Sequence, residues 1–280
     1  MISNVKSVLI ALTKVSGEDE VPSAVSYGLS LAQQAGAHAT VEAVSLRLAL
    51  TSPSVGHIVT GLVNAENRRL QALTELAVQR AQSDAKASGV ICSTQNPQLS
   101  YNDLLASSTA LARVHDLTVI DGEPEAVSPD RALIEALLTD SGRPLIVVPP
   151  GREIFSSQRI IVAWDGSARA ARAVADALPF LRSAEAVEVI SVTGEKKIPD
   201  TIEGADIAPH LARHGITASV RNVPAQGGDV AQILRDAATH FSADMIVMGG
   251  YVHSRLREMI FGGVTQSLLK SSPVPLLISY

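Results

Sequence analysis

Short aliphatic runs alternate along the chain with Ala-rich stretches of helical periodicity. Residues 8–12 form the first run and are followed by a helical stretch at 22–34, and residues 160–164 are followed by one at 168–181. Continuous apolar runs are typical of strands buried on both faces, whereas apolar residues every three to four positions are typical of amphipathic helices. The pattern therefore predicts strands and helices in alternation.

The second half of the chain repeats the pattern of the first. Later strands of the first copy have counterparts in the second: 39–44 matches 186–192, 116–120 matches 244–248, and 143–148 matches 274–279. Alternating βα units form parallel sheets with right-handed crossovers. We therefore predict an α/β fold of two tandem Rossmann-like domains. Each is expected to be an open five-stranded parallel sheet of order 3-2-1-4-5 with helices on both faces.

The boundary between the copies is expected at Pro149-Pro150-Gly151, because Pro and Gly end a strand there. This gives a first copy at residues 1–150 and a second copy at 151–280. The first copy is the longer one, and its extra residues fall in a long helical stretch at 56–87. The apolar residues of that stretch recur at helical spacing: Val59, Val63, Leu70, Leu73 and Ala77.

Composition narrows the class of protein. The chain is 46% hydrophobic, 18% charged and carries a net charge of −5, so it has no basic surplus for nucleic acid. No apolar run is long enough to cross a membrane, and the start lacks a signal-peptide pattern, so a cytoplasmic protein is expected. The single cysteine, Cys92, excludes an intrachain disulfide, and we interpret it as a small core residue of an apolar strand at 90–92.

A ligand crevice is expected in the second copy, beyond the carboxyl ends of strands 1 and 4, where the strand order reverses. Asp165-Gly166-Ser167 follows strand 1, Gly249-Gly250 follows strand 4, and Gly262-Gly263 enters the last helix. Glycine amides at a helix start suit a phosphate, and Asp165 could accept a hydrogen bond from a ribose hydroxyl or a base amino group. Glycines after parallel strands also serve as ordinary turn residues, so it stays open that these glycines form turns and bind no ligand.

Together these residues resemble the universal stress protein family from residue 159 to 280. Nucleotide-binding members carry Gly, two residues, Gly, nine residues, Gly and then Ser or Thr after strand 4. Here Gly249 and Gly262 occupy the first and third glycine positions, but Val252 replaces the second glycine and Gly263 replaces the Ser or Thr. The first copy resembles the family only in its strand pattern, so the whole resembles a tandem-type member.

The resemblance implies a site for ATP with Mg²⁺ in the second copy, weakened by Val252 and Gly263. The residues implied around the base and ribose are Ala163, Asp165 and Val192. Those implied along the ribose-phosphate side are Met248, Gly249, His253, Gly262, Gly263 and Val264. His253 and Arg255, expected in a polar loop, could add positive charge. The first copy is expected to bind no nucleotide, because Thr13 replaces the aspartate and Asp121, Glu123 and Glu125 would repel phosphate.

No signature of a P-loop, dinucleotide fingerprint, zinc protease or serine hydrolase is present, so we predict no catalytic residues and no enzyme. His210 and His214 stand four apart without a third ligand, so no metal site is predicted either. Asp229 is expected to cap the helix that follows it. The implied function is a non-enzymatic stress-response or regulatory protein. The alternative is an interaction scaffold that has lost nucleotide binding.

The final strand of each copy is an aliphatic edge, and family members dimerise through this strand. We therefore predict that residues 145–148 and 276–279 pair within one chain as an intrachain pseudo-dimer. Association of two chains into a homodimer stays open.

Overall fold

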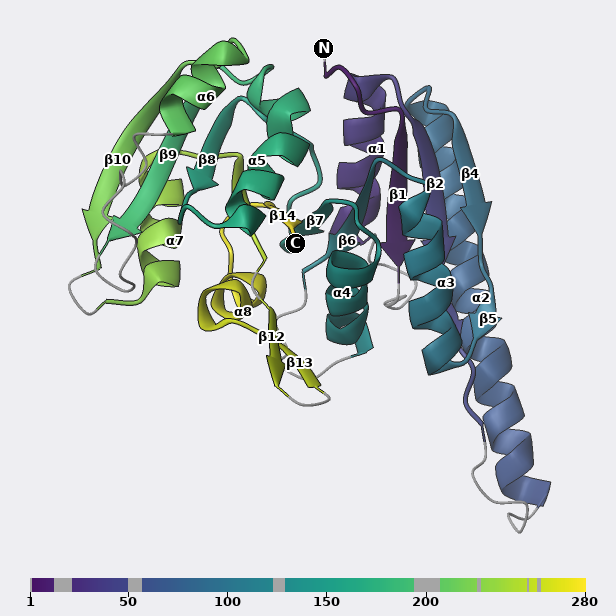
Figure 1. Cartoon of the computed structure of the whole chain (residues 1–280). Helices are drawn as coiled ribbons and strands as arrows, with labels where there is room; N and C mark the ends of the chain where they lie inside the picture. The colour runs from purple at the N-terminus through teal and green to yellow at the C-terminus, as the bar shows by residue number, and fades with distance from the viewer. Residues whose placement is uncertain are drawn as a thin grey trace.

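The computed structural model describes residues 2–12, 22–49, 57–122, 129–193, 207–225, 228–250, 252–255 and 258–280. Its centre is one ten-stranded sheet with helices on both faces (Figure 1). The first copy contributes five strands to that sheet: β1 (Ser7–Leu12), β2 (His38–Ala43), β4 (Cys92–Gln95), β6 (Leu117–Asp121) and β7 (Leu145–Val148). The second copy contributes another five: β8 (Arg159–Ala163), β9 (Ala186–Thr193), β10 (Ala218–Pro224), β11 (Met245–Gly249) and β14 (Leu276–Ser279).

The strand order is β10-β9-β8-β11-β14-β7-β6-β1-β2-β4. Each half therefore has the predicted order 3-2-1-4-5, and the prediction is confirmed. The two halves join where β14 runs antiparallel to β7, with Leu277 opposite Ile146, while the neighbouring pairs within each half are parallel. The predicted intrachain pairing of the final strands is thus also confirmed. It removes two aliphatic sheet edges from solvent.

Helices cover the sheet in two layers. Buried residues on one face come from α1 (Ser23–Ala35), α2 (His57–Ala87), α5 (Ala168–Leu181) and α6 (Ile207–Arg213). Those on the other face come from α3 (Tyr101–Arg113), α4 (Pro129–Asp140), α7 (Val230–His240) and α8 (Gly263–Lys270). Both layers contain residues of both copies, so the copies share their hydrophobic cores. Two short sheets, β3 (Ser45–Leu46) with β5 (Gln98–Leu99) and β12 (Val252–Arg255) with β13 (Glu258–Phe261), complete the described elements.

Phe155, in the connection between β7 and β8, fixes one copy against the other. Its ring lies 5.4 Å from that of Tyr27 on α1 and 5.8 Å from that of Phe180 on α5. The amide of Phe155 donates to Ser30 Oγ (3.2 Å), and its carbonyl accepts from Gln34 Nε2 (2.8 Å). The connection is therefore packed and hydrogen-bonded between α1 and α5.

The duplication extends to individual side chains. Asp116 Oδ2 accepts from the amides of Lys6 and Ser7 at 2.7 and 2.9 Å, and Asp244 Oδ2 accepts from the amide of Arg159 at 2.8 Å. In both copies the carboxylate before strand 4 thus holds the start of strand 1. Asp229 caps α7 by accepting from the amide of Ala231 at 2.9 Å, as predicted.

The predicted helical stretch of the first copy is α2, described from His57 onward. Its C-terminal half packs on the sheet through Thr74, Val78, Ala81 and Ala85, and its N-terminal half projects past the sheet (Figure 1). The apolar residues noted in the sequence are more exposed than these four, and Val59 is 41% exposed.

The prediction for Cys92 was correct only in part, because its side chain packs against the core cluster without being fully buried. Ile91 is 76% exposed, the strand begins at Cys92, and Cys92 itself is only half-buried, because β4 is the edge strand of the sheet. Among the described residues, no helix has the length and apolar character needed to cross a bilayer.

Candidate functional site

The carboxyl ends of β8, β9 and β11 bring three predicted residues together, and the start of α8 adds a fourth. Ala163 lies opposite Met248 on one side and Ile190 on the other, and Val192 follows two positions after Ile190. Met248 is buried in the same apolar cluster against which Ala163, Val192 and Val264 pack. These four side chains therefore form an apolar floor at the point where the strand order reverses.

Asp165 stands at the rim of this floor in a defined turn. Its Oδ1 accepts from the amide of Ser167 at 3.0 Å, and Gly166 between them takes a φ of +71°, which favours glycine. Ser167 then caps α5, with its Oγ accepting from the amide of Ala170 at 3.1 Å. The turn fixes the backbone of Asp165 and leaves its side chain exposed to solvent.

Gly249 is required by packing. A Cβ at this position would lie 2.7 Å from the amide nitrogen of Ala170 and 2.7 Å from the carbonyl carbon of Arg169, both in the first turn of α5. The following Gly250 is buried, and a Cβ there would lie 2.6 Å from Cδ2 of Leu138 of the first copy. Both glycines let neighbouring elements approach the end of β11.

Helix α8 begins beside the floor, since Val264 of its first turn packs against the same cluster. Gly262 is the N-cap residue, with φ −60° and ψ 153°, and no side chain caps the helix. The first amides of a helix lack intrahelical partners and carry partial positive charge. Gly263 is exposed, and a Cβ added to it would meet no atom within 4 Å. The helix start can thus donate to an anion.

The stretch between the two glycine pairs differs from the prediction. A polar loop was expected around His253 and Arg255, but β12 and β13 form an antiparallel hairpin with Val252 opposite Phe261. The side chains of His253 and Arg255 lie outside the described part of the chain. Val252 lies in extended strand backbone, which suits a β-branched residue. Valine at 252 and the Ile260-Phe261 pair were the sequence signal for strands that the motif interpretation missed.

The corresponding place in the first copy is arranged differently. Asp121 lies opposite Val148 as Gly249 lies opposite Ser279, so the two residues hold the same sheet position. Asp121 Oδ1 accepts from the amide of Ala24 in the first turn of α1 at 2.8 Å. The carboxylate thus occupies the helix start itself. Thr13, Glu123 and Glu125, from which the absence of nucleotide was predicted, lie outside the described residues.

A buried carboxyl in the first copy was not anticipated from the sequence. Glu42 on β2 is 1% exposed and accepts from Gln95 Nε2 at 3.3 Å. Its Oε2 and the hydroxyls of Ser45 and Ser108 have no hydrogen-bond partner among the described residues. Burial raises the pKa of the Glu42 carboxyl above its ordinary value of 4.5.

His210 and His214 lie close together, with ring centroids 4.7 Å apart. His214 Nδ1 contacts Arg182 Nη2 at 3.0 Å, so this imidazole is engaged with a cation. Within the described ranges, no group of three or more His, Cys, Asp or Glu side chains could hold a metal ion.

Two doubly wound units fused through their final strands define a tandem Rossmann-like α/β protein. The model of the Universal stress protein family matches residues 156–279, which include the predicted crevice. Residues 156–279 therefore form a domain that matches the universal stress protein family.

A curated relative and two solved structures are similar to this chain. Stress response protein NhaX of Bacillus subtilis is 26% identical over 165 residues, which cover 45% of this chain and 99% of NhaX. A universal stress protein from Archaeoglobus fulgidus has the same fold over 97% of both chains, with a TM-score of 0.69 and 17% identity. A functionally unknown protein from Pseudomonas aeruginosa PAO1 covers 99% of this chain and 92% of its own, with a TM-score of 0.56 and 15% identity.

Proposed function

We propose that this protein is a non-enzymatic stress-response protein whose second copy binds ATP, with Mg²⁺, in the crevice at the carboxyl ends of β8, β9 and β11. The observation that supports the proposal most is the convergence of an apolar floor, an exposed carboxylate at its rim and an uncapped helix start. An adenine nucleotide has the matching parts: an apolar base, a ribose with hydroxyl donors, and an anionic phosphate chain.

Each part of the site then has a role. Ala163, Val192 and Met248 contact the base, and Asp165 accepts hydrogen bonds from the ribose. The first-turn amides of α8 at Gly263 and Val264 donate to phosphate, whose charge the helix dipole stabilises. Gly263 supplies an amide but no hydroxyl, and one missing hydrogen bond to a charged group costs about 1.5–3 kcal/mol, or roughly ten- to a hundredfold in affinity. We therefore expect binding near the millimolar range.

The alternative function is a ligand-free interaction scaffold. One observation favours it: residues 252–255 pair with 258–261 as a hairpin, so part of the stretch between the motif glycines is already hydrogen-bonded to itself. In that case the chain serves as a fixed pseudo-dimer, and the crevice is a remnant of the fold.

Titration calorimetry of the full chain with ATP and Mg²⁺ separates the two functions. Asp165→Ala should abolish detectable binding, whereas Gly263→Ser should tighten it about tenfold by restoring a hydroxyl where nothing obstructs a side chain. Glu185→Ala is the matched control, since this exposed carboxylate lies at the opposite, amino end of the sheet. If neither wild type nor Gly263→Ser binds millimolar ATP, the scaffold is the correct function.

The non-enzymatic part of the proposal has its own measurement. Incubation of the purified chain with ATP and Mg²⁺ should release ADP no faster than the Asp165→Ala variant does. Multiple turnovers that disappear in Asp165→Ala would show an enzyme instead.

A further inference from the structure

Helix α2 carries more apolar surface than the sheet covers. The face built from Thr74, Val78, Ala81 and Ala85 is buried against the sheet. A second stripe runs along the neighbouring face with the alternating three- and four-residue spacing of a coiled-coil seam. Its members are Val59, Leu62, Glu66, Arg69, Leu73 and Leu76.

This second stripe, which we call the α2 seam, is accessible to solvent. Val59 is 41% exposed, Leu62 is 65% exposed, and Leu73 and Leu76 are half-buried. The side chains of Glu66 and Arg69 are 41% and 66% exposed and form an ion pair of 2.8 Å within the helix. A helix that only covers a sheet needs one apolar face, so the exposed Val59 and Leu62 have no role in the fold of one chain.

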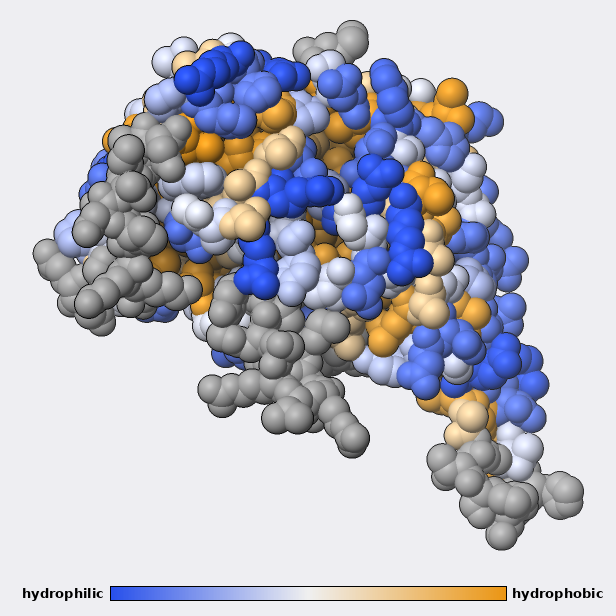
Figure 2. Space-filling model, in the orientation of Figure 1, coloured by the Kyte–Doolittle hydropathy of each residue, from blue (hydrophilic) through white to orange (hydrophobic). Residues whose placement is uncertain are grey.

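The N-terminal part of the seam lies on the half of α2 that projects beyond the sheet (Figure 1). Figure 2 shows apolar surface on this projection among hydrophilic residues. Leu48 is 45% exposed and is held beside the projection by two hydrogen bonds to Asn67. The amide of Leu48 donates to Asn67 Oδ1 (2.8 Å), and Asn67 Nδ2 donates to the carbonyl of Leu48 (3.0 Å). A projecting element with exposed apolar groups marks a surface for association.

The order of residues along the seam identifies the occupant. From Val59 to Leu76 it reads apolar, apolar, acidic, basic, apolar, apolar, so it is complementary to itself when reversed. A twofold axis between residues 67 and 68 would place Val59 opposite Leu76, Leu62 opposite Leu73, and Glu66 opposite Arg69. Such an isologous contact forms each pair twice. We propose that the α2 seam is a homodimerisation surface on which two chains pair their α2 helices antiparallel.

The size of the seam sets the expected strength. Residues 59–76 span about 26 Å of helix, and one helix pair of that length gives an interface at the small end of the range for specific complexes. The dimer should therefore dissociate in roughly the micromolar range. Sedimentation velocity of the full chain from about 1 to 300 µM spans this transition.

The first test removes the apolar contact. Leu62→Asp should leave a monomer at every concentration while the melting temperature stays that of the wild-type monomer, because Leu62 is exposed and has no packing role in one chain. Arg68→Glu, an exposed change on the polar side of the same helix, is the control and should dimerise like wild type. A wild-type chain that is monomeric throughout, or a dimer that survives Leu62→Asp, overturns the proposal.

The second test reverses the charges. Glu66→Arg and Arg69→Glu chains should each be monomeric, because positions 66 and 69 then carry like charges across the twofold axis. An equimolar mixture should form a heterodimer, since every crossed pair again joins opposite charges. If the mixture stays monomeric, the antiparallel pairing is wrong. This test needs no nucleotide, so its outcome is independent of the proposed ATP site.

Discussion

Asp121 of the first copy and Gly249 of the second occupy equivalent positions of the duplicated sheet. Both lie beside the start of the helix that follows strand 1, but they contact it in different ways. In the second copy a glycine lets the first turn of α5 approach the strand so closely that a Cβ would lie 2.7 Å from backbone atoms. In the first copy a carboxylate replaces that contact and accepts a hydrogen bond from the amide of Ala24 on α1. One helix start is packed against the strand, and the other is held by a side chain.

The difference teaches which parts of the duplication are free to change. One scaffold contact is the same in both copies: the equivalent carboxylates of Asp116 and Asp244 both accept from a backbone amide at the start of strand 1. The cap of the helix after strand 1 differs: in the first copy the Asp121 carboxylate accepts from the amide of Ala24 on α1, whereas in the second copy Ser167 caps the equivalent helix α5.

The strongest test of this comparison is Gly249→Ala. The added methyl group collides with the backbone of α5, which cannot rotate away as a side chain would, so we expect a loss of about 3 kcal/mol in unfolding free energy. Urea unfolding measures it. Gly263→Ala is the control, because a methyl group there meets nothing, and its change should stay within about 1 kcal/mol. Equal losses at both positions would contradict the packing role.

The counterpart in the first copy is Asp121→Ala. Loss of the acceptor leaves the amide of Ala24 without its cap and should cost about 1–2 kcal/mol. Hydrogen exchange of the first turn of α1 should accelerate in this variant. Asp121→Asn retains an acceptor and should lose less than half as much. If the Asp121→Asn and Asp121→Ala variants are equally destabilised, the hydrogen bond to α1 is not the contact through which Asp121 stabilises the fold.

A smaller effect is expected where the copies meet. The Tyr27 hydroxyl is buried without a hydrogen-bond partner among the described residues, and burial raises its pKa, so the phenol stays protonated. Tyr27→Phe keeps the ring against Phe155 and removes the unsatisfied group, which should increase stability by about 1 kcal/mol. Thermal unfolding measures this gain, with the exposed Tyr101→Phe as a neutral control. A destabilised Tyr27→Phe variant would show that the hydroxyl is satisfied.

The smallest effect depends on pH. Glu42 holds the sheet position that Ile190 holds in the second copy, and burial raises its pKa above 4.5. The folded state therefore favours the protonated carboxyl. The stability it contributes is complete below the unfolded pKa and is lost as pH rises through the folded pKa. Glu42→Gln should match wild type at the acidic end and be more stable at pH values well above 4.5, in urea unfolding across that range. An advantage of Glu42→Gln that does not change with pH would contradict this.

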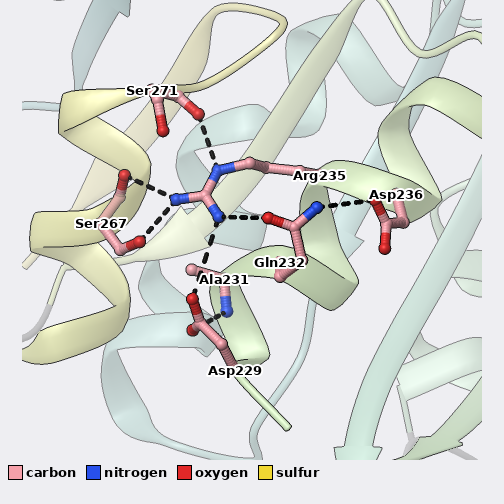
Figure 3. Close-up of polar contacts among 7 residues, drawn as sticks. All are labelled: Asp229, Ala231, Gln232, Arg235, Asp236, Ser267 and Ser271. Carbon is pink, nitrogen blue, oxygen red and sulfur yellow. Dashed lines mark hydrogen bonds and ion pairs between the residues drawn. The ribbon is translucent and has the colours of Figure 1, made fainter.

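Figure 3 shows how an arginine of the second copy bonds the end of a neighbouring helix, and the first copy makes a similar contact with an arginine at another position. Arg235 on α7 donates to the carbonyls of Ser267 and Ser271 at 2.9 and 2.8 Å and so holds the end of α8 (Figure 3). In the first copy Arg113 on α3 donates to the carbonyl of Asp140 at the end of α4. In both copies an arginine side chain thus donates to the last carbonyls of a helix, but the arginine stands at a different position of the neighbouring helix.

Much of the fold could be predicted from local pattern. The bounds of α5, the strand order and the pairing of residues 145–148 with 276–279 were all expected. Buried parallel strands require continuous aliphatic runs, and the alternation of strand and helix leaves few topologies. Cys92 packs against the core but is less buried than predicted, because an apolar triplet does not reveal that its strand lies at an edge.

The candidate site was predicted only in part. Ala163 and Met248 lie opposite each other and Val192 lies on the neighbouring strand, as expected from strand ends, since the carboxyl ends of parallel strands meet. The motif spacing concealed the hairpin around Val252, because a pattern of glycines records neither the pairing nor the backbone between them.

The order of apolar and polar residues by itself determined the duplication, the parallel sheets and the strand ends at which a ligand could bind, because these follow from periodicity within each segment. Tertiary structure alone decided that Gly249 makes room for α5, that the carboxylate of Asp121 caps α1, and that the α2 seam faces solvent. Each of these depends on distances between residues far apart in the chain, and a one-dimensional pattern does not contain those distances.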